Sequence, residues 1–485
     1  MKTLRNVLKI PELRNKLLFT LFMVAVYRFG AHIPVPGIDL AAINDLKERA
    51  DQGGVLSFLQ TFSGGAITQF AIFALGIMPY ITASIIMQIL AVVIPKLEQW
   101  QEQGAVGQRK ITQWTRYLGV SIALLQGTGI TYLFRTGGGG GFGGGGNSTG
   151  LDLFGDNYTV GRFALVVLTL TSGFALLMWF GEVVTQRGVG NGMSILIFAS
   201  VVSRLPSNFA TVRAESGTLA MLAIAAMFVL LLVAIVFIEQ GVRRIPVQFA
   251  KRQVGRKMYG GQSTYIPLKV NGAGVISIIF ASSVLYLPVI VSQILPVGDA
   301  TASNPNWAFN VQRWVDGNLV RATSPFYLAF YGILIVAFAY FYTAIQFDPH
   351  KQADQIRKQG GFIPGIRPGH QTERYLAKIL SRITLPGALF VAAIALVPAY
   401  AIGQALGETD GGQQLGFFGI SILIAVGVSL ETVKQIDGQL MMRNYEGFLD
   451  TAKAAGKSSG GKSTARAAAS AAKAKGAKPA KSSSK

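Results

Sequence analysis

Long apolar runs, almost free of charge, recur along the whole chain and restrict its fold more than any other feature. A helix of about 20 apolar residues crosses a hydrocarbon core of about 30 Å. Because lipid offers backbone groups no hydrogen bonds, only helices and closed barrels span it. Charged residues make up 14% of this 485-residue chain, against roughly a quarter in soluble domains. We therefore expect an all-α polytopic membrane protein with ten transmembrane helices: Leu17–Ile33, Phe70–Ile94, Thr115–Phe134, Phe163–Val184, Asn191–Arg204, Leu219–Ile238, Ala273–Leu295, Phe326–Phe347, Ile383–Ile402 and Leu415–Glu431.

The positive charges indicate how these helices are oriented. Most of the 44 Lys and Arg residues lie before the first span, after the last span and in alternate connections between spans. Positive residues concentrate on the cytoplasmic side of a membrane, so both termini are expected in the cytoplasm. Ten spans also divide into two halves of five, residues 1–205 and 206–447, which must have opposite topology. Inverted halves of this kind surround a path at their interface.

Two segments of biased composition lie between or beyond the spans. Residues 136–150 are rich in glycine, and we expect a flexible linker on the outer side. Residues 448–485 are basic and rich in Ala, Lys, Gly and Ser, so this tail is expected to be disordered. A plain solubilising tail is the favoured interpretation, and attraction to anionic lipid or RNA stays open.

Residues that carry chemistry are scarce. The chain has no cysteine and only three scattered histidines, so no metal site is expected. Because catalytic groupings and nucleotide-binding loops are missing as well, we expect no cofactor and no enzymatic activity. Arg28, inside the first span, is expected to extend to the interface. An ion-coupled secondary transporter with inverted repeats is the alternative function, but it needs intramembrane ionisable residues that this chain largely lacks.

The second expected span is interrupted. In the stretch Thr61–Pro95, Gly64 and Gly65 precede one apolar segment, and Gly76 and Pro79 separate it from a second. A broken helix is unfavourable against lipid and is tolerated where it borders a cavity. The interruption therefore predicts that the protein encloses a path.

Two inner connections are much longer than most loops. Residues 239–272 alternate apolar and polar positions, which predicts a β-hairpin with the sequence "VGRKMYGG" at its tip. Residues 348–382 contain "FIPGIRPG", in which prolines and glycines present Ile366 and Arg367 on a stiff turn. Exposed loops of this kind commonly dock a partner.

Several motifs of the chain resemble the SecY family, the pore subunits of the bacterial protein-translocation channel. The resemblance runs in order from Leu17 to about Gly447 and departs from the family in the glycine-rich loop, the basic tail and Met193, where isoleucine is common. The motifs that carry it are "IPVPG", "FSGGAITQFAIFALGIMPYITASII", "RGVGNGMSI", "AKRQVGRKMYGGQSTYIPLKVN" and "GFIPGIRPGHQT".

The resemblance implies ten helices in two inverted halves around an hourglass pore, which passes unfolded polypeptides and releases apolar segments sideways into lipid. It implies a plug at residues 56–69, containing Leu59, Phe62, Ser63, Gly64 and Gly65. The implied partners are the small membrane subunits SecE and SecG, the motor ATPase SecA and the ribosome, and the implied location is the bacterial cytoplasmic membrane. The implied pore ring is Ile77, Ile81, Met193, Ile197, Ile279 and Ile424.

The residues themselves give partial support to these roles. Ile77 and Ile81, like Met193 and Ile197, are four residues apart and share a helix face, although packing against lipid explains any one of them. The family implies a lateral gate near Gln88 and Asn271, which otherwise indicate ordinary bonds between helices. It also implies motor or ribosome docking at three basic residues, Arg256, Lys257 and Arg367.

Overall fold

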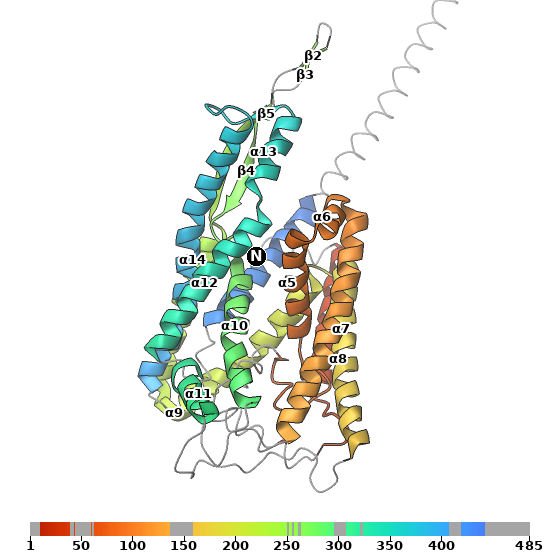
Figure 1. Cartoon of the computed structure of the whole chain (residues 1–485), viewed down its shortest axis with the longest axis vertical. Coiled ribbons are helices and arrows are strands. Elements are labelled where there is room, and N and C mark those ends of the chain that lie inside the picture. Colours follow the sequence, from red (N-terminus) through yellow and green to blue (C-terminus); the bar gives the residue numbers. More distant parts are fainter. Residues whose placement is uncertain are drawn as a thin grey trace, which may run out of the picture. The chain divides into compact units, whose positions relative to one another are not determined.

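The computed structural model describes most of the predicted membrane core (Figure 1). The chain divides into two compact units, one of residues 16–430 and the other of residues 1–15 and 431–485, and the packing below lies within the first. The described residues are 10–38, 43, 60, 63–135, 159–249, 252–254, 257–259, 263–294, 307–320, 324–406 and 419–441. The glycine-rich linker at 136–150 and the basic tail at 448–485 lie outside them.

Every predicted span contains a helix. Within the described ranges, six helical segments are long and apolar enough to cross a bilayer, and the pair α5 and α6, bent by 101°, makes a seventh if it is counted as one span. Helices α2, α7 and α10 cover the other predicted spans, so the structure is consistent with ten crossings. The helices are α2 Pro11–Gly30, α5 Met78–Val93, α6 Pro95–Glu102, α7 Ala105–Arg135, α8 Val160–Arg187, α9 Gly192–Glu239, α10 Gly274–Ile294, α11 Trp307–Val315, η3 Asp316–Val320, α12 Pro325–Gln346, α13 Pro349–Lys358, α14 His370–Leu406 and a last helix Gly419–Met441.

The outer connection between the fifth and sixth expected spans is shorter than expected. The helix of the fifth span continues past Arg204, and α9 consists of two helical segments, Gly192–Ala214 and Gly217–Glu239, that meet at a kink. The apolar run ends at Arg204, but a helix satisfies its own backbone in water as well as in lipid, so hydropathy does not mark its end. The element bends at Gly217, whose φ of 81° lies in the left-handed region that favours glycine.

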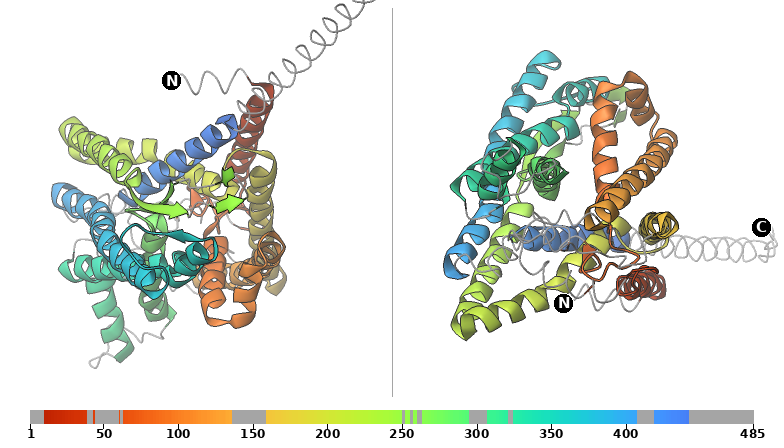
Figure 2. Two further views of the ribbon diagram at one scale, coloured as in Figure 1. Left: turned by 90° about the horizontal axis from the view of Figure 1, so that it is seen from above. Right: turned by 60° about the horizontal axis from the view of Figure 1, so that its bottom comes forward.

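The helices form two packed groups joined by α9. In the first, α5 packs on α7, α7 on α8 and α8 on α9. In the second, α10 packs on α12 and α12 on α14, while α14 also contacts α9 (Figure 2). These groups match the order of the two predicted halves, and the inverted relation between the halves stays a prediction.

The two long inner connections fold together into one module. Strands β1 (Val242–Phe249) and β4 (Ser263–Lys269) pair antiparallel, and the short strands β2 (Arg252–Val254) and β3 (Lys257–Tyr259) extend the hairpin toward its tip. This confirms the predicted β-hairpin. Strand β5 (Gly361–Phe362), from the other connection, adds to the free edge of β1. The core of this module consists of Ile245, Val247, Leu268, Ile356, Ile363, Leu376 and Ile379.

A charged contact links this module to the first helix group. The amine of Lys351, in α13, donates to Glu98 Oε1 at 2.5 Å and lies 3.8 Å from Glu102 Oε1. Both acids belong to α6, so the contact joins residues more than 240 positions apart. We name it the α6–α13 clasp. The hydrogen bond to Glu98 raises the pKa of Lys351 and keeps its amine charged.

Reversing the charge in the clasp should separate α6 from α13. We predict that Lys351→Glu, which places a carboxylate beside two others, lengthens the distance between spin labels at Gln101 and Gln355, two exposed residues of α6 and α13. The measurement is pulsed electron paramagnetic resonance at low salt, because salt screens exposed pairs.

Lys358→Glu, at an exposed cation of the same helix, is the matched control and should leave the distance unchanged. Adding Glu98→Lys and Glu102→Lys to Lys351→Glu should restore the short distance. The clasp would be disproved by the same distance distribution in all four proteins.

Candidate functional site

The interrupted second span is the centre of the candidate site. Helix α5 begins at Met78, so only the second part of the expected span Phe70–Ile94 is helical, and residues 64–77 form successive turns. The break at Gly76 and Pro79 is confirmed, with a left-handed φ of 58° at Gly76. Pro79, in the first turn of α5, lacks the N–H that a continuing helix would use.

The backbone of these turns is paired with another segment of the chain. The N–H of Val35 donates to the carbonyl of Phe70 at 3.0 Å, and the N–H of Ile72 donates to the carbonyl of Ile33 at 3.0 Å. These bonds replace part of the hydrogen bonding that a helix would have provided. The motif "IPVPG" therefore acts as a short strand-like partner for the interrupted span.

The six predicted ring residues lie in two adjoining apolar clusters. Ile77 and Met193 belong to one buried cluster, and Ile279 and Ile424 belong to the other. Ile81 and Ile197 are half-buried and pack against both. The fold therefore brings together aliphatic side chains from four separate parts of the sequence.

These side chains offer no polar partner to whatever lies between them. Flexible aliphatic groups adapt to different shapes, and a narrow apolar constriction opposes ion passage by dewetting. Met193, with an unbranched side chain, also packs against Gly181 of α8, where a Cβ would collide with its sulfur. The substitution of methionine for the common isoleucine thus keeps this surface apolar.

A turn at residues 63–65, which we name the Ser63 turn, is tied to α2 by polar bonds, and through Tyr27 to Ser200 of α9. Tyr27 Oη donates to the carbonyl of Ser63 at 3.2 Å and lies 2.5 Å from Ser200 Oγ. Arg28 Nη1 donates to the carbonyl of Gly64 at 2.9 Å. The half-buried guanidinium of Arg28 therefore has one partner inside the protein, and its extension to the interface stays a prediction.

Close packing restricts the same turn. Gly64 and Gly65 have φ of 64° and 90°, and a Cβ on Gly64 would lie 2.9 Å from Ser200 Cα. The left-handed backbone conformation thus favours glycine at both positions. At position 64, the backbone of Ser200 also leaves no room for a side chain. Of the other predicted plug residues, Leu59 and Phe62 lie outside the described residues.

Sequence analysis missed two members of this network, Tyr27 and Ser200. Both are fully buried, with 0% of their surface exposed. A hydroxyl group in an apolar span needs a partner, so each could have been singled out as a polar residue within a predicted helix. The sequence does not show that Tyr27 and Ser200 are partners, because they lie 173 positions apart in the chain.

The two predicted lateral-gate residues have partners within their own parts of the structure. Asn271 Nδ2 donates to Glu239 Oε1 at 2.7 Å, and Asn271 Oδ1 accepts from the N–H of Gly274 at 2.9 Å. Asn271 thereby joins the end of α9 to the start of α10. Gln88 is half-buried, and its amide donates to Ser84 in the same helix at 3.5 Å. Their part in a gate stays a prediction.

The predicted docking residues lie in the inner module. Arg367 is exposed at the turn before α14, and Thr372 Oγ1 donates to its carbonyl at 3.0 Å. Ile366, expected on the same tip, instead packs against the core of the module. Lys257 pairs with Val254 through the β2–β3 ladder, while Arg256 lies outside the described residues.

A cluster of ionisable groups holds α13 against the start of α14 beside this turn. His350 Nδ1 and His370 Nδ1 lie 3.2 Å and 3.0 Å from the same oxygen, Glu373 Oε2. The hydrogen bond to Glu373 raises the pKa of His350, and the bonds from His370 and His350 lower the pKa of Glu373. In the described part of the chain no group of acids and histidines is arranged to hold a metal ion.

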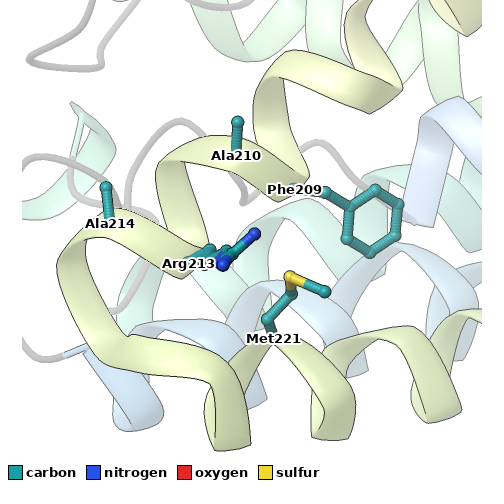
Figure 3. A pocket seen from close by; sticks show the side chains of 5 residues that line it. All are labelled: Phe209, Ala210, Arg213, Ala214 and Met221. Carbon is teal, nitrogen blue, oxygen red and sulfur yellow. The ribbon is translucent and has the colours of Figure 1, made fainter.

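One pocket lies away from the predicted site, at the bend of α9 (Figure 3). It has a volume of about 410 Å³ and is lined by Phe209, Ala210, Arg213, Ala214 and Met221. None of the predicted ring, gate or docking residues contributes to it.

Comparisons with known proteins agree on one family. The SecY family model matches residues 71–433. The SecY protein translocase subunit of Streptomyces griseus is 50% identical over 449 residues, covering 91% of this chain and 98% of the relative. That of Mycobacterium bovis is 46% identical over 445 residues, with the same coverage of both chains.

Solved structures show the same fold at low sequence identity. A structure described as a protein-conducting channel has a TM-score of 0.54 at 18% identity, covering 87% of this chain and 91% of the other. Sec61 from a canine ribosome–channel complex has a TM-score of 0.51 at 17% identity over the same shares. On the match to the family model and to these relatives, the chain belongs to the SecY family of protein translocase subunits.

Proposed function

We propose that this chain forms the protein-conducting path of a translocase in the bacterial cytoplasmic membrane. The carrying observation is that six aliphatic residues from distant parts of the sequence meet in adjoining apolar clusters beside an interrupted helix. Unfolded polypeptides pass through this ring, and apolar segments leave sideways into lipid. A partner supplies the energy for this movement.

The ring acts as a seal that fits varied chains. Because its side chains are apolar and flexible, it makes no directional bond with a passing polypeptide, and it excludes hydrated ions when it closes. The Ser63 turn forms the hinge of a plug on the outer side of the ring; Leu59 and Phe62, also assigned to this plug by resemblance, lie outside the described residues. Tyr27, Arg28 and Ser200 hold that hinge in the resting position.

The lateral exit opens between α5 and α10. Gln88 lies on the first of these helices, and Asn271 precedes the second. The bond of Asn271 to Glu239 anchors the inner end of α10 to α9, so α10 would move together with the second helix group. The α6–α13 clasp would hold the two groups together on the inner side.

The inner module is the proposed docking surface for SecA and the ribosome. Arg256, Lys257 and Arg367 supply the positive charge, and a guanidinium can bind carboxylate or phosphate groups in a bidentate manner. A solved structure of similar fold is described as a Ssh1 complex bound to the yeast ribosome, with a TM-score of 0.52. SecE and SecG are the proposed small membrane subunits.

Crosslinking tests the path directly. The chain has no native cysteine, so Ile81→Cys provides a single thiol in the ring. We predict a disulfide between this residue and a cysteine in a stalled secretory substrate, because the substrate must pass the ring. The measurement is the shift of the crosslinked product on a non-reducing gel.

Val229→Cys, at a residue 58% exposed on the outer surface of α9, is the control and should give no product. Equal crosslinking from both positions, or crosslinking from Val229 alone, would contradict the proposed path.

Loosening the Ser63 turn should favour the open state. We predict that Tyr27→Phe and Ser200→Ala each raise ion leak through reconstituted channels, because each removes hydroxyl bonds at the hinge. One such bond contributes about 1 kcal/mol, which is roughly a fivefold change in the equilibrium. The measurement is single-channel conductance in planar bilayers.

Thr131→Val removes a buried hydroxyl that donates within its own helix, to Gly127. It should leave the leak at the level of the unmodified protein. If all three substitutions give the same leak, the bonds at the Ser63 turn do not control opening.

Charge reversal at the inner tip should block docking. We predict that Arg367→Glu abolishes translocation while the protein remains inserted in the membrane, because the carboxylate repels the acidic or phosphate groups of the partner. Translocation of a secretory substrate into inverted membrane vesicles measures the effect. Lys378→Glu, at an exposed cation of α14, is the matched control. Normal translocation by Arg367→Glu would exclude this residue from docking.

A further inference from the structure

A short amphipathic helix lies between α10 and α12 in the sequence and has no part in the proposed path. Helix α11 exposes Trp307, Val311 and Trp314, which are 69%, 41% and 51% accessible. Their spacing of four and three residues places them on one face of the helix. Val315, the last residue of the helix, borders this stripe, is 4% exposed and belongs to the larger apolar cluster. The helix is therefore fixed at its C-terminal end and leaves the aromatic stripe uncovered.

The stripe continues onto the exposed surface of α12. The ring of Trp314 meets that of Phe326 edge-on, with centroids 5.5 Å apart. Phe326, itself 45% exposed, stacks on Phe330 at 5.9 Å, one turn further along the helix. Since α12 is among the helices apolar enough to cross a bilayer, this surface passes without interruption from α11 to a lipid-facing helix.

The position of α11 along the bundle indicates the depth of the stripe. Helix α11 and η3 contact α10, and η3 also contacts α12. Figure 1 shows α11 at the opposite end of the helix bundle from β5 and α13. Because the basic connections containing β5 and α13 face the cytoplasm, α11 lies at the outer boundary of the membrane.

We propose that the stripe of Trp307, Val311 and Trp314 inserts into the outer leaflet, at the boundary between phospholipid headgroups and acyl chains. Tryptophan is enriched at this depth, where its ring is apolar and its N–H remains near water. A helix with one apolar face and polar remaining faces lies in the plane of such an interface. Arg313, exposed away from the stripe, faces the headgroups and water.

The consequence is an anchor for two helices of the second group. Because α11 and η3 pack on α10 and α12, insertion of the stripe holds the outer ends of both helices at a constant depth. Sideways opening would then proceed by movement parallel to the membrane plane, without lifting these ends out of the leaflet.

The absence of native cysteine makes the test direct. Trp307→Cys, Val311→Cys and, as the control position, Arg313→Cys are each labelled with an environment-sensitive fluorophore. The full-length translocase is reconstituted into phosphatidylcholine and phosphatidylglycerol vesicles. We expect blue-shifted emission and quenching by brominated acyl chains at 307 and 311. At 313 we expect red-shifted emission and quenching by aqueous iodide.

Two results would overturn the proposal. Iodide quenching at 307 and 311 equal to that at 313, without an effect of brominated lipid, would place the stripe in water. Protection from both quenchers at 307 and 311 would show that a protein surface covers it. Trp307 and Val311 carry the test because Trp314 packs on Phe326, so a disturbance caused by replacing Trp314 does not affect the outcome.

Discussion

Backbone hydrogen bonding in the absence of water is the constraint on which the rest of this structure depends. A helix satisfies it locally, and most of the chain does so. The turns at residues 64–77 do so only in part, and two further bonds pair them with Ile33 and Val35. A second segment beside the interruption thus supplies backbone partners that the turns lack. The same interruption sets where α5 begins and hence where Ile77 and Ile81 lie.

Apolar and polar interactions have different roles around this interruption. The proposed ring residues contribute apolar packing without directional bonds, which would suit the adaptable surface that we propose. Tyr27, Arg28 and Ser200 contribute directional bonds, which fix one position of the Ser63 turn. The hydroxyl of Tyr27 lies within hydrogen-bond distance of the Ser63 carbonyl, that of Ser200 of the Leu196 carbonyl, and the two hydroxyls of each other. The two hydroxyl hydrogens are therefore shared among three contacts. The turn is therefore held by a network that can rearrange as a unit.

The inner side combines a rigid module with charged contacts. Strand β5 joins the second long connection to the hairpin of the first by pairing with β1. Beside Arg367, Glu373 forms hydrogen bonds with His350 and His370. The clasp between α6 and α13 is exposed instead, so solvent and salt weaken it easily. The module is thus held by paired strands and a buried core, and its contact with α6 by exposed charges.

The sequence by itself determined the helical membrane class, the break at Gly76 and Pro79 and the β-hairpin, because hydropathy, glycine and proline act locally. Motif resemblance named the six ring residues, but only the tertiary structure brought them into adjoining clusters. The tertiary structure also decided the partner of Arg28, the continuity of α9 past Arg204 and the start of α5 at Met78. Each depends on what a side chain or backbone group meets across the bundle, and a buried polar group takes whichever partner packing brings within reach.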